Sequence, residues 1–230
     1  MSSRLTLDYD RTSTLFICLL KGSEMKKVLL MAAALLLAPM AAMAADYKEG
    51  VHYTVINEGP ESAKPEITEF FSFYCPHCYN FAKTVVPKIQ ANLPEGVTFN
   101  QSHVEFIGRE MGVEMSRAFA IAKQLNVEEK IEPALFSAIH DKRQQFTRAD
   151  DVRALFIANG VDAKAYDAAA SSFMVNAQMS KMKRDTENAK ISGVPSLVVN
   201  GKYRVETGSI KSYDELIDIA FYLSTMNKKQ

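Results

Sequence analysis

Residues 69–78 read Glu-Phe-Phe-Ser-Phe-Tyr-Cys-Pro-His-Cys, an apolar run that ends in two cysteines three positions apart. The run is too continuously apolar to alternate, which predicts a strand buried on both faces. Pro76 favours a helix start directly after it, because proline loses no hydrogen bond at the first helical position. Cys75 and Cys78 are therefore expected at a strand-to-helix junction, an arrangement typical of thiol–disulfide exchange.

This junction makes Cys75 the N-cap of the predicted helix, with His77 and Cys78 in its first turn. A thiolate at Cys75 can then accept hydrogen bonds from the amides of His77 and Cys78, at the positive end of the helix dipole. A protonated His77 would add a positive charge beside the sulfur. We therefore expect the pKa of Cys75 to lie well below the ordinary value of about 8.5. A stabilised thiolate makes the disulfide easier to reduce, so the pair should oxidise other proteins.

Two other interpretations of the cysteine pair were weighed. A structural zinc site usually has four ligands, but the only other cysteine is Cys18, and His52, His103 and His140 stand singly. We therefore assign no metal ligand. An inert disulfide across so short a loop would constrain little of the unfolded chain. Disulfide exchange accounts for the pair better than either alternative.

The front of the chain carries a targeting pattern over residues 25–44. Two lysines follow Met25, residues 28–38 form an apolar stretch, and Ala42-x-Ala44 matches a cleavage site. This pattern is typical of a secretory signal peptide. The apolar stretch is shorter than the ~20 residues that span a membrane comfortably, and an uncleaved anchor is the alternative.

Residues 1–24 fit no targeting pattern, and Met25 stands where a start codon would be expected. We interpret residues 1–24 as an upstream extension that is not part of the fold, so that Cys18 would be absent from the mature protein. Cleavage after Ala44 would begin the mature protein at Ala45. Export would place it in the periplasm, an oxidising compartment in which disulfide chemistry belongs.

Composition narrows the possible partners. Without residues 1–44 the chain has 186 residues, with 22 basic and 24 acidic side chains. This balance offers no basic excess for nucleic acid or for an anionic membrane surface. A chain of this length can bury a substantial core without covalent cross-links. The cysteine pair is therefore not needed to hold the fold together.

Five strands are predicted from apolar runs bounded by turn residues: 51–56, 67–74, 97–104, 196–199 and 203–205. The helix that opens at Cys75 is expected to reach about Ile89, with a bend at Pro87. Strand, helix and strand in this order imply a parallel, right-handed crossover. Asn200-Gly201 is expected to form a hairpin turn, and Ser212 is expected to cap the last helix.

The stretch from about residue 106 to 188 has a helical pattern only. Pro133 is expected to start one helix, Thr147 and Asp150 to form a capping box, and Asp162 to cap a later helix. The methionines here are interpreted as core filler rather than as a binding face. The chain is thus predicted to be an α/β sheet domain, residues 45–105 and 189–230, interrupted by an inserted helical domain, residues 106–188.

Pro195 stands at the entrance to a predicted strand, at the end of Ser192-Gly193-Val194-Pro195. A proline is tolerated there because the missing N–H need not join the ladder. Only about 5–6% of X–Pro bonds in folded proteins are cis, which favours an ordinary trans proline. The sequence pattern by itself leaves the isomer open.

Several of these segments together resemble one known family. The segments are Phe-Phe-Ser-Phe-Tyr-Cys-Pro-His-Cys (70–78), Gly-Val-Pro (193–195), Val-Asn-Gly-Lys-Tyr (199–203) and the helical insertion. They resemble the DsbA family of bacterial thiol:disulfide interchange proteins, and the likeness runs from Tyr47 onward. The resemblance implies a thioredoxin fold with an inserted all-helical domain. It also implies that Cys75 is the exposed attacking cysteine and Cys78 its buried partner, with Pro76 and His77 completing the catalytic motif.

The resemblance assigns further residues to the site. It implies that Pro195 is cis and lies beside the sulfurs, and that the backbone of Val194 pairs with an incoming peptide. Glu69 falls where the family has a buried acid, which is expected to transfer protons. The sequence departs from the family at two positions, with Gln101 in place of an expected lysine and Ala82 in place of a second acid. A buried carboxyl without these partners should have a raised pKa.

The family's activity is implied in the same way. The protein would donate a Cys75–Cys78 disulfide to reduced, newly exported proteins and would need no bound cofactor. The quinone-linked membrane protein DsbB would reoxidise it, and it would act as a monomer. The alternatives are a disulfide isomerase or reductase, which must stay reduced, and a peptide-binding chaperone whose cysteines are incidental. The residues left after cleavage have no room for the separate dimerisation domain that exported isomerases commonly carry.

Overall fold

A computed structural model describes residues 47–57, 59 and 61–226 of the chain. The upstream extension predicted for residues 1–24 and the signal peptide predicted for residues 25–44 lie outside this part of the chain. None of the helices in the described part is long and apolar enough to cross a membrane.

The described residues form one five-stranded sheet. Its strands are β1 (Tyr53–Val55), β2 (Glu66–Phe71), β3 (Thr98–His103), β4 (Ser196–Val199) and β5 (Tyr203–Val205). The spatial order is β1-β5-β4-β2-β3, with β2 and β3 parallel and the other pairs antiparallel. The β4–β5 hairpin turns at Asn200 and Gly201, which both have positive φ angles (53° and 63°). The predicted hairpin and the parallel pair are both confirmed.

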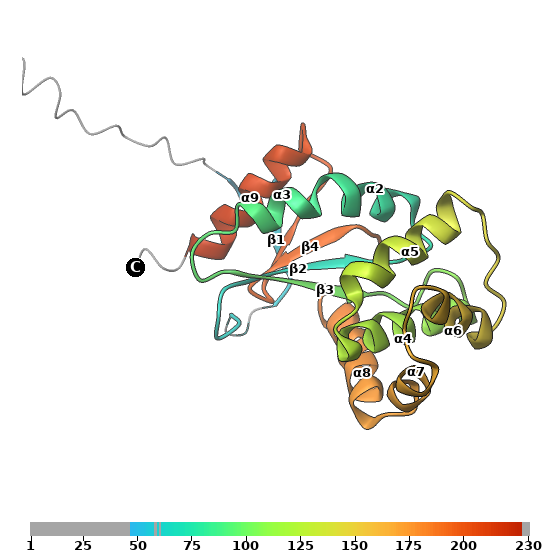
Figure 1. Ribbon diagram of the computed structural model, residues 1–230. Coiled ribbons are helices and arrows are strands. Elements are labelled where there is room, and N and C mark those ends of the chain that lie inside the picture. The colour runs from blue at the N-terminus through green and yellow to red at the C-terminus, as the bar shows by residue number, and fades with distance from the viewer. Residues whose placement is uncertain (1–46, 58, 60, 227–230) are drawn as a thin grey trace, which may run out of the picture. The chain divides into compact units, whose positions relative to one another are not determined.

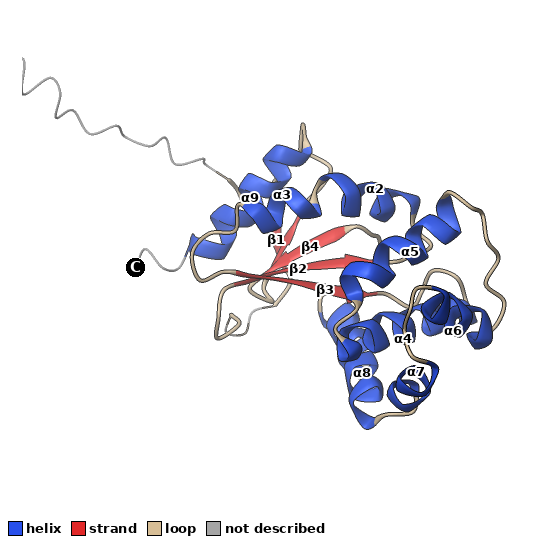
Figure 2. Cartoon of the chain, in the orientation of Figure 1, coloured by secondary structure: helices blue, strands red, loops and turns tan. Residues whose placement is uncertain are grey.

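Helices lie against this sheet and beyond its β3 edge (Figures 1 and 2). They are α2 (Pro76–Thr84), α3 (Val86–Ala91), α4 (Glu110–Leu125), α5 (Glu128–His140), α6 (Ala149–Ala158), α7 (Ala163–Ala170), α8 (Phe173–Asn188) and α9 (Tyr213–Thr225). Figure 1 shows α2, α3 and α9 along one side of the sheet. Only helices, α4 to α8, stand between β3 and β4 in the chain.

Three helix boundaries differ from the prediction. The helix that opens at Cys75 does not bend at Pro87 but ends at Thr84, and Pro87 lies in the first turn of a new helix, α3. Pro133 lies inside α5 rather than at its start, because Asn126 adopts a left-handed conformation that ends α4 and lets α5 begin at Glu128.

The third difference concerns the cap of α6. The carboxylate of Asp151, not that of Asp150, accepts hydrogen bonds from the backbone N–H groups of Thr147 and Arg148. The predicted caps at Asp162 and Ser212 are confirmed, since each side chain accepts from the backbone N–H three residues on.

The core has two main parts. One part lies between the sheet and α2, α3 and α9, and includes Ile67, Phe81 and Leu216. The other fills the helical region and takes in Phe71 and Phe73, from β2 and the loop after it. Met115, Met179 and Met182 belong to this second part, which confirms their prediction as core residues. The same prediction is wrong for Met174 of α8, which is 64% exposed. The cysteine segment therefore lies where the two parts of the core meet.

Candidate active site

The N-cap predicted for Cys75 is present. Its backbone is extended (φ −92°, ψ 114°), and Pro76 opens α2. The backbone N–H of Cys78 donates to Cys75 Sγ at 3.2 Å. The N–H of Cys75 donates to the carbonyl of Ser72 at 3.0 Å, which holds the turn between β2 and α2. The sulfur is thus fixed at the helix terminus by local backbone geometry.

The two thiols have opposite electrostatics. The pKa of Cys75 is lowered to about 6, chiefly by a hydrogen bond from the Cys78 side chain, against a desolvation cost. Backbone N–H groups of Cys78 and His77 lower it further, and the charge of His77 contributes least. The pKa of Cys78 is raised, first by its hydrogen bond to Cys75 and then by burial. Both cysteines are free thiols, and of the two Cys75 ionises the more readily while Cys78 keeps its proton.

Cys75 is less accessible than the resemblance implied. It is 6% exposed and Cys78 is 0% exposed, so Cys75 is a buried residue with a small opening rather than an exposed one. The reason is its N-cap position against the loop that carries Val194. Pro76 and His77 are exposed and surround this opening. As predicted, Cys75 is more exposed to solvent than Cys78, but the difference between their exposed fractions is small.

A second loop reaches the sulfur from the far end of the chain. The Val194–Pro195 peptide bond is cis, as the resemblance implied. The thiol of Cys75 donates to the carbonyl oxygen of Val194 at 3.4 Å. This hydrogen bond exists only for the protonated sulfur, because a thiolate has no proton to donate. The loop just before β4 thus contacts the reactive sulfur directly.

Glu69 lies beneath the cysteine pair on β2 and is 1% exposed. The parallel register pairs it with Gln101 on β3, whose Nε2 donates to Glu69 Oε2 at 3.0 Å. Desolvation raises the pKa of Glu69 to about 8, and the amide of Gln101 offsets only part of that. The raised pKa expected for a carboxyl with Gln101 as its partner is therefore confirmed.

The sequence pattern gave no indication of Glu132, on α5. This carboxyl is partly buried, and its pKa is raised to about 7, first by desolvation and then by Glu128. It acts electrostatically on Glu69 and interacts with the same Gln101 amide. Its place depends on how α5 packs on α4 and α2, which no local signal in the sequence encodes.

Two histidines that the sequence presented as isolated hold the backbone of Phe73. His103 Nε2 accepts from the N–H of Phe73 at 3.1 Å, and its Nδ1 lies 2.8 Å from Ser116 Oγ. Burial lowers the pKa of His103 to about 3, so the ring is neutral and its Nδ1–H donates to Ser116. On the other side, His140 Nε2 donates to the Phe73 carbonyl at 2.8 Å. Both peptide groups next to Phe73 are therefore paired, which steadies the segment leading to Cys75.

No three His, Cys, Asp or Glu side chains in the described part of the chain gather in a way that could hold a metal ion. The residues brought together are Cys75, Cys78, Val194 and Glu69, with His77 on the surface beside them. A nucleophilic thiolate, a protonated partner thiol and a buried acid can together carry out thiol–disulfide exchange.

Comparison with known proteins gives consistent matches over most of the chain. Residues 66–217 match the DSBA-like thioredoxin domain. The thiol:disulfide interchange protein DsbA of Escherichia coli is 36% identical over 204 residues, which cover 88% of this chain and 97% of that protein. The protein of the same name from Dickeya dadantii is 38% identical over 188 residues, covering 81% of this chain and 89% of its own length.

A solved structure adds a peptide complex to these matches. DsbA of Proteus mirabilis, in a cysteine-to-serine variant with the non-covalently bound peptide PWATCDS, superposes with a TM-score of 0.71. The two chains are 37% identical, and the match covers 81% of this chain and 100% of the other.

Proposed function

The chain belongs to the DsbA-like thioredoxin family and is a thiol–disulfide oxidoreductase, and on that premise we propose that it donates a Cys75–Cys78 disulfide to newly exported proteins. Its fold is the thioredoxin-like fold of that family. The observation that carries the proposal is the placement of Cys75 at the start of α2, where the hydrogen bond from the Cys78 side chain, followed by the backbone N–H groups of Cys78 and His77, lowers the pKa of its thiol to about 6. A thiol that ionises so readily is a good leaving group, and its disulfide is readily reduced.

The reaction has two exchanges. A substrate thiolate attacks Cys75 Sγ, the Cys75–Cys78 bond breaks, and its electron pair goes to Cys78. The mixed disulfide between substrate and Cys75 is then attacked by a second substrate thiolate. The substrate leaves with its own disulfide, and Cys75 leaves as a thiolate held by the amides of His77 and Cys78. Two electrons have passed from the substrate to the cysteine pair, and no bound cofactor is needed.

Val194 and Pro195 are the proposed peptide-binding residues. Their loop contacts Cys75 Sγ, so a peptide whose cysteine reacts with that sulfur must lie along it. The peptide complex of the related Proteus mirabilis protein supports a role of this kind. Glu69, buried beneath the pair, is the proposed donor of the proton that Cys78 takes up when the disulfide opens.

The proposed location of the protein in the cell depends on the predicted signal peptide. We propose that residues 25–44 are a signal peptide, that residues 1–24 are not part of the mature protein, and that the protein works in the periplasm as a monomer. DsbB, a quinone-linked membrane protein, is the proposed reoxidant. Residues 45–105 and 189–230 would form the thioredoxin-like domain, with residues 106–188 as its helical insertion. An intact mass of the exported protein that begins at Ala45 would agree with this, and one that retains residues 25–44 would contradict it.

A stoichiometric transfer experiment tests the function itself. The oxidised protein is mixed with a reduced peptide that contains two cysteines, and both products are quantified by mass after acid quenching. We expect one peptide disulfide for each Cys75–Cys78 disulfide consumed. A protein that binds the peptide but leaves its thiols reduced would be a chaperone, and the proposal would be wrong.

A further inference from the structure

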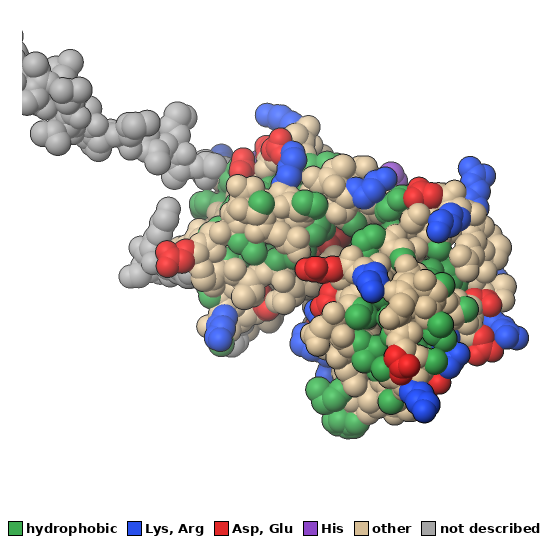
Figure 3. Space-filling model, in the orientation of Figure 1, with side chains coloured by type: hydrophobic (Ala, Val, Ile, Leu, Met, Phe, Trp, Pro, Cys, Tyr) green, Lys and Arg blue, Asp and Glu red, His purple; other side chains and the backbone are tan. Residues whose placement is uncertain are grey.

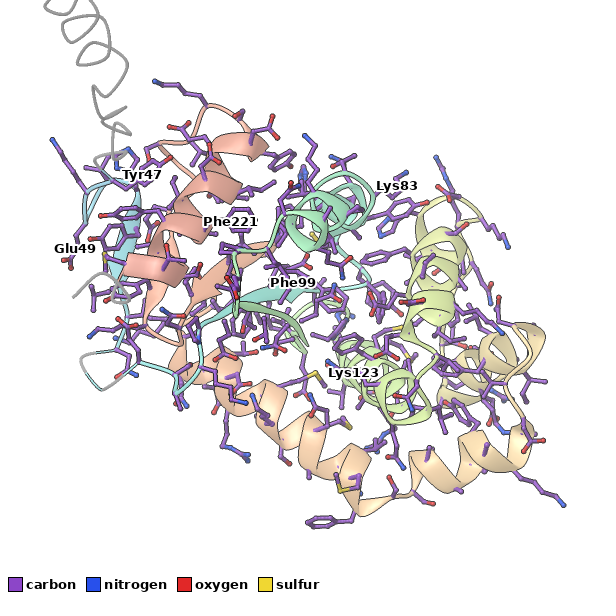
Figure 4. All side chains as sticks on the ribbon, turned by 60° about the vertical axis from the view of Figure 1, so that its left-hand side comes forward. Tyr47, Glu49, Lys83, Phe99, Lys123 and Phe221 are labelled. Atoms are coloured by element: carbon purple, nitrogen blue, oxygen red, sulfur yellow. The ribbon has the colours of Figure 1, made fainter. Side chains whose placement is uncertain are left out.

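A cavity of about 680 Å³ opens beside α2 and extends inward toward β3. Its lining comes from the helices α2, α3, α4 and α5 and from strand β3, and includes Ala82 and Lys83 of α2, Phe99 and Gln101 of β3, Lys123 of α4 and Glu132 of α5. Figure 4 labels Lys83, Phe99 and Lys123, which surround this opening from three of those elements. In the space-filling view of Figure 3, the surface between α2 and α5 is hollowed, with charged side chains beside the hollow.

The inner end of this cavity lies next to the buried acid of the active site. Gln101 lines the cavity and also donates to Glu69 Oε2 at 3.0 Å. The same amide interacts with the carboxyl of Glu132, which lines the cavity as well. Ala82 contributes only a methyl group to the lining, so α5 rather than α2 supplies the second acid. A continuous series of polar groups therefore runs from Glu69 through Gln101 to Glu132 and the open cavity.

We propose that Glu132 is the outer member of a proton relay, with Glu69 as the inner member and Gln101 holding the two carboxyls together. This inference rests on the proposed function, because the relay serves the buried sulfur of Cys78. A relay is needed because solvent reaches neither group directly: Cys78 is 0% exposed and Glu69 is 1% exposed. Glu132 is a positioning and proton-supplying residue that does not touch the substrate.

The proton balance of the step is simple. When the substrate thiolate attacks Cys75, the electron pair of the broken S–S bond goes to Cys78. Protonated Glu69 gives its proton to Cys78 and becomes a carboxylate. Glu132 passes its proton to Glu69 through water in the cavity beside Gln101, and is itself reprotonated by water that enters the cavity from solvent. The amide of Gln101 neither gains nor loses a proton and serves to keep the two carboxyls in place.

Both acids have pKa values suited to this task. That of Glu69 is raised to about 8 and that of Glu132 to about 7, in each case mainly by desolvation. Each value depends on other charges nearby. Glu69 is raised further by Glu132 and Cys75, whereas Glu132 is raised by Glu128 and lowered by Lys123. Other charged residues that line the cavity are Lys83 and Glu129.

The test replaces Glu132 with glutamine, which keeps the shape and removes the charge. In the oxidised protein, glutamate side-chain carbons are followed by NMR as the pH is varied, and the Glu69 signal is assigned by its loss in Glu69→Gln. Because Glu132 raises the pKa of Glu69, Glu132→Gln should lower the apparent pKa of Glu69 by on the order of one unit. This readout does not depend on activity.

Glu129→Gln is the matched control, because Glu129 lies on the same helix, lines the same cavity and is exposed. It should leave the Glu69 titration unchanged. A Glu69 titration in Glu132→Gln that matches the wild type would overturn the relay. If Glu132→Gln does not fold, Glu132→Ala decides in its place, because it also removes the charge that raises the pKa of Glu69, and an unmoved Glu69 titration in that variant would refute the coupling.

A second readout concerns the reaction. The rate at which a dithiol peptide reduces the Cys75–Cys78 disulfide is measured across pH 5 to 9 with the peptide thiolate concentration held constant. Glu132→Gln should shift the pH profile to lower pH and slow the reaction about threefold or more at neutral pH. Glu132→Asp, which retains an acid, should restore much of the wild-type profile. Equal profiles for wild type and Glu132→Gln, in a protein that still transfers disulfides, would refute the relay and leave the proposed function intact.

Discussion

The β2–α2 junction and the acid pair behind it are built in different ways. At the junction, the Cys75 thiolate is stabilised chiefly by the Cys78 thiol and then by the backbone N–H groups of Cys78 and His77, all within the next three residues of the chain. The acid pair consists of Glu69 and Glu132, which meet only because β2, β3 and α5 pack together around Gln101. The first region fixes which sulfur reacts, and the second affects the proton that its partner needs. Chemistry encoded locally can thus depend on a proton supply that is encoded only by the tertiary fold.

The largest expected effects separate the two cysteines of the junction. Cys75→Ser should abolish disulfide exchange, because Cys78, the other cysteine in the described part of the chain, is 0% exposed. Cys78→Ser should leave Cys75 able to react with a disulfide-containing substrate but unable to be released by its partner, so mixed disulfides should accumulate. Non-reducing gels measure both. Mixed disulfides that form with Cys75→Ser and not with Cys78→Ser would reverse the assignment.

The acid pair makes a prediction about stability against pH. The pKa of Glu69 is raised on folding from 4.5 to about 8, so the folded state binds the proton more tightly than the unfolded one. The favourable contribution of the Glu69 carboxyl to the stability of the folded protein is complete below pH 4.5 and is lost as the pH rises through 8. Glu69→Gln should therefore gain stability relative to the wild type between these values, by on the order of 4 kcal/mol at pH 8.

Denaturant melts at pH 4.5 and pH 8 measure this difference. The stability gained by Glu69→Gln should be near zero at pH 4.5, where the Glu69 carboxyl of the folded wild type is protonated and neutral, like the glutamine that replaces it. A gain of equal size at both pH values would mean that the substitution acts through packing rather than through the buried charge.

The junction makes the complementary prediction for the two redox forms. Folding lowers the pKa of Cys75 to about 6, so the reduced form gains stability that is fully present above the unfolded cysteine pKa and is lost as the pH falls through 6. The oxidised form has no such ionisation, and its short loop gains little from cross-linking. At pH 7 the reduced protein should be the more stable by on the order of 1 kcal/mol after allowance for solvent screening.

Denaturant melts of both forms at pH 7 and pH 5 measure this difference, which should shrink at the lower pH. An oxidised protein that unfolds at the higher denaturant concentration at pH 7 would contradict the stabilised-thiolate account.

The smallest expected effect belongs to His77. Its charge contributes least among the effects that lower the pKa of Cys75, and its side chain is exposed. His77→Ala should raise the pKa of Cys75 by a few tenths of a unit, which would make the protein a slightly weaker oxidant. Lys83→Gln is a suitable control, because it removes a positive charge from the last turn of the same helix. An unchanged or lower Cys75 pKa in His77→Ala would refute the role assigned to this residue.

These two regions also differ in how far the sequence predicted them. The N-cap at Cys75, the caps at Asp162 and Ser212 and the hairpin at Asn200 depend on neighbours within a few residues, and all were predicted. The break between α2 and α3 and the start of α5 were predicted wrongly, because packing and a left-handed Asn126 override the proline signals.

The candidate active site likewise includes features that neighbouring residues predict and features that depend on elements distant in the chain. The sequence pattern left the isomer of the Val194–Pro195 bond open, and only the family resemblance implied that it is cis. It gave no indication of Glu132, or of the contacts of His103 and His140 with Phe73, because those side chains come from elements distant in the chain. The small opening at Cys75 also depends on a distant loop, which is why its exposure was overestimated.

The central claim is that the folded helix terminus stabilises the Cys75 thiolate. Thiolate absorbance near 240 nm, followed from pH 3 to pH 10 in the reduced protein and compared with the oxidised protein as a blank, measures this directly. The account predicts a first transition with a midpoint near 6, equal to one thiolate per molecule, and no second thiolate from Cys78 below pH 9. A first transition at the ordinary cysteine value of about 8.5 would contradict it.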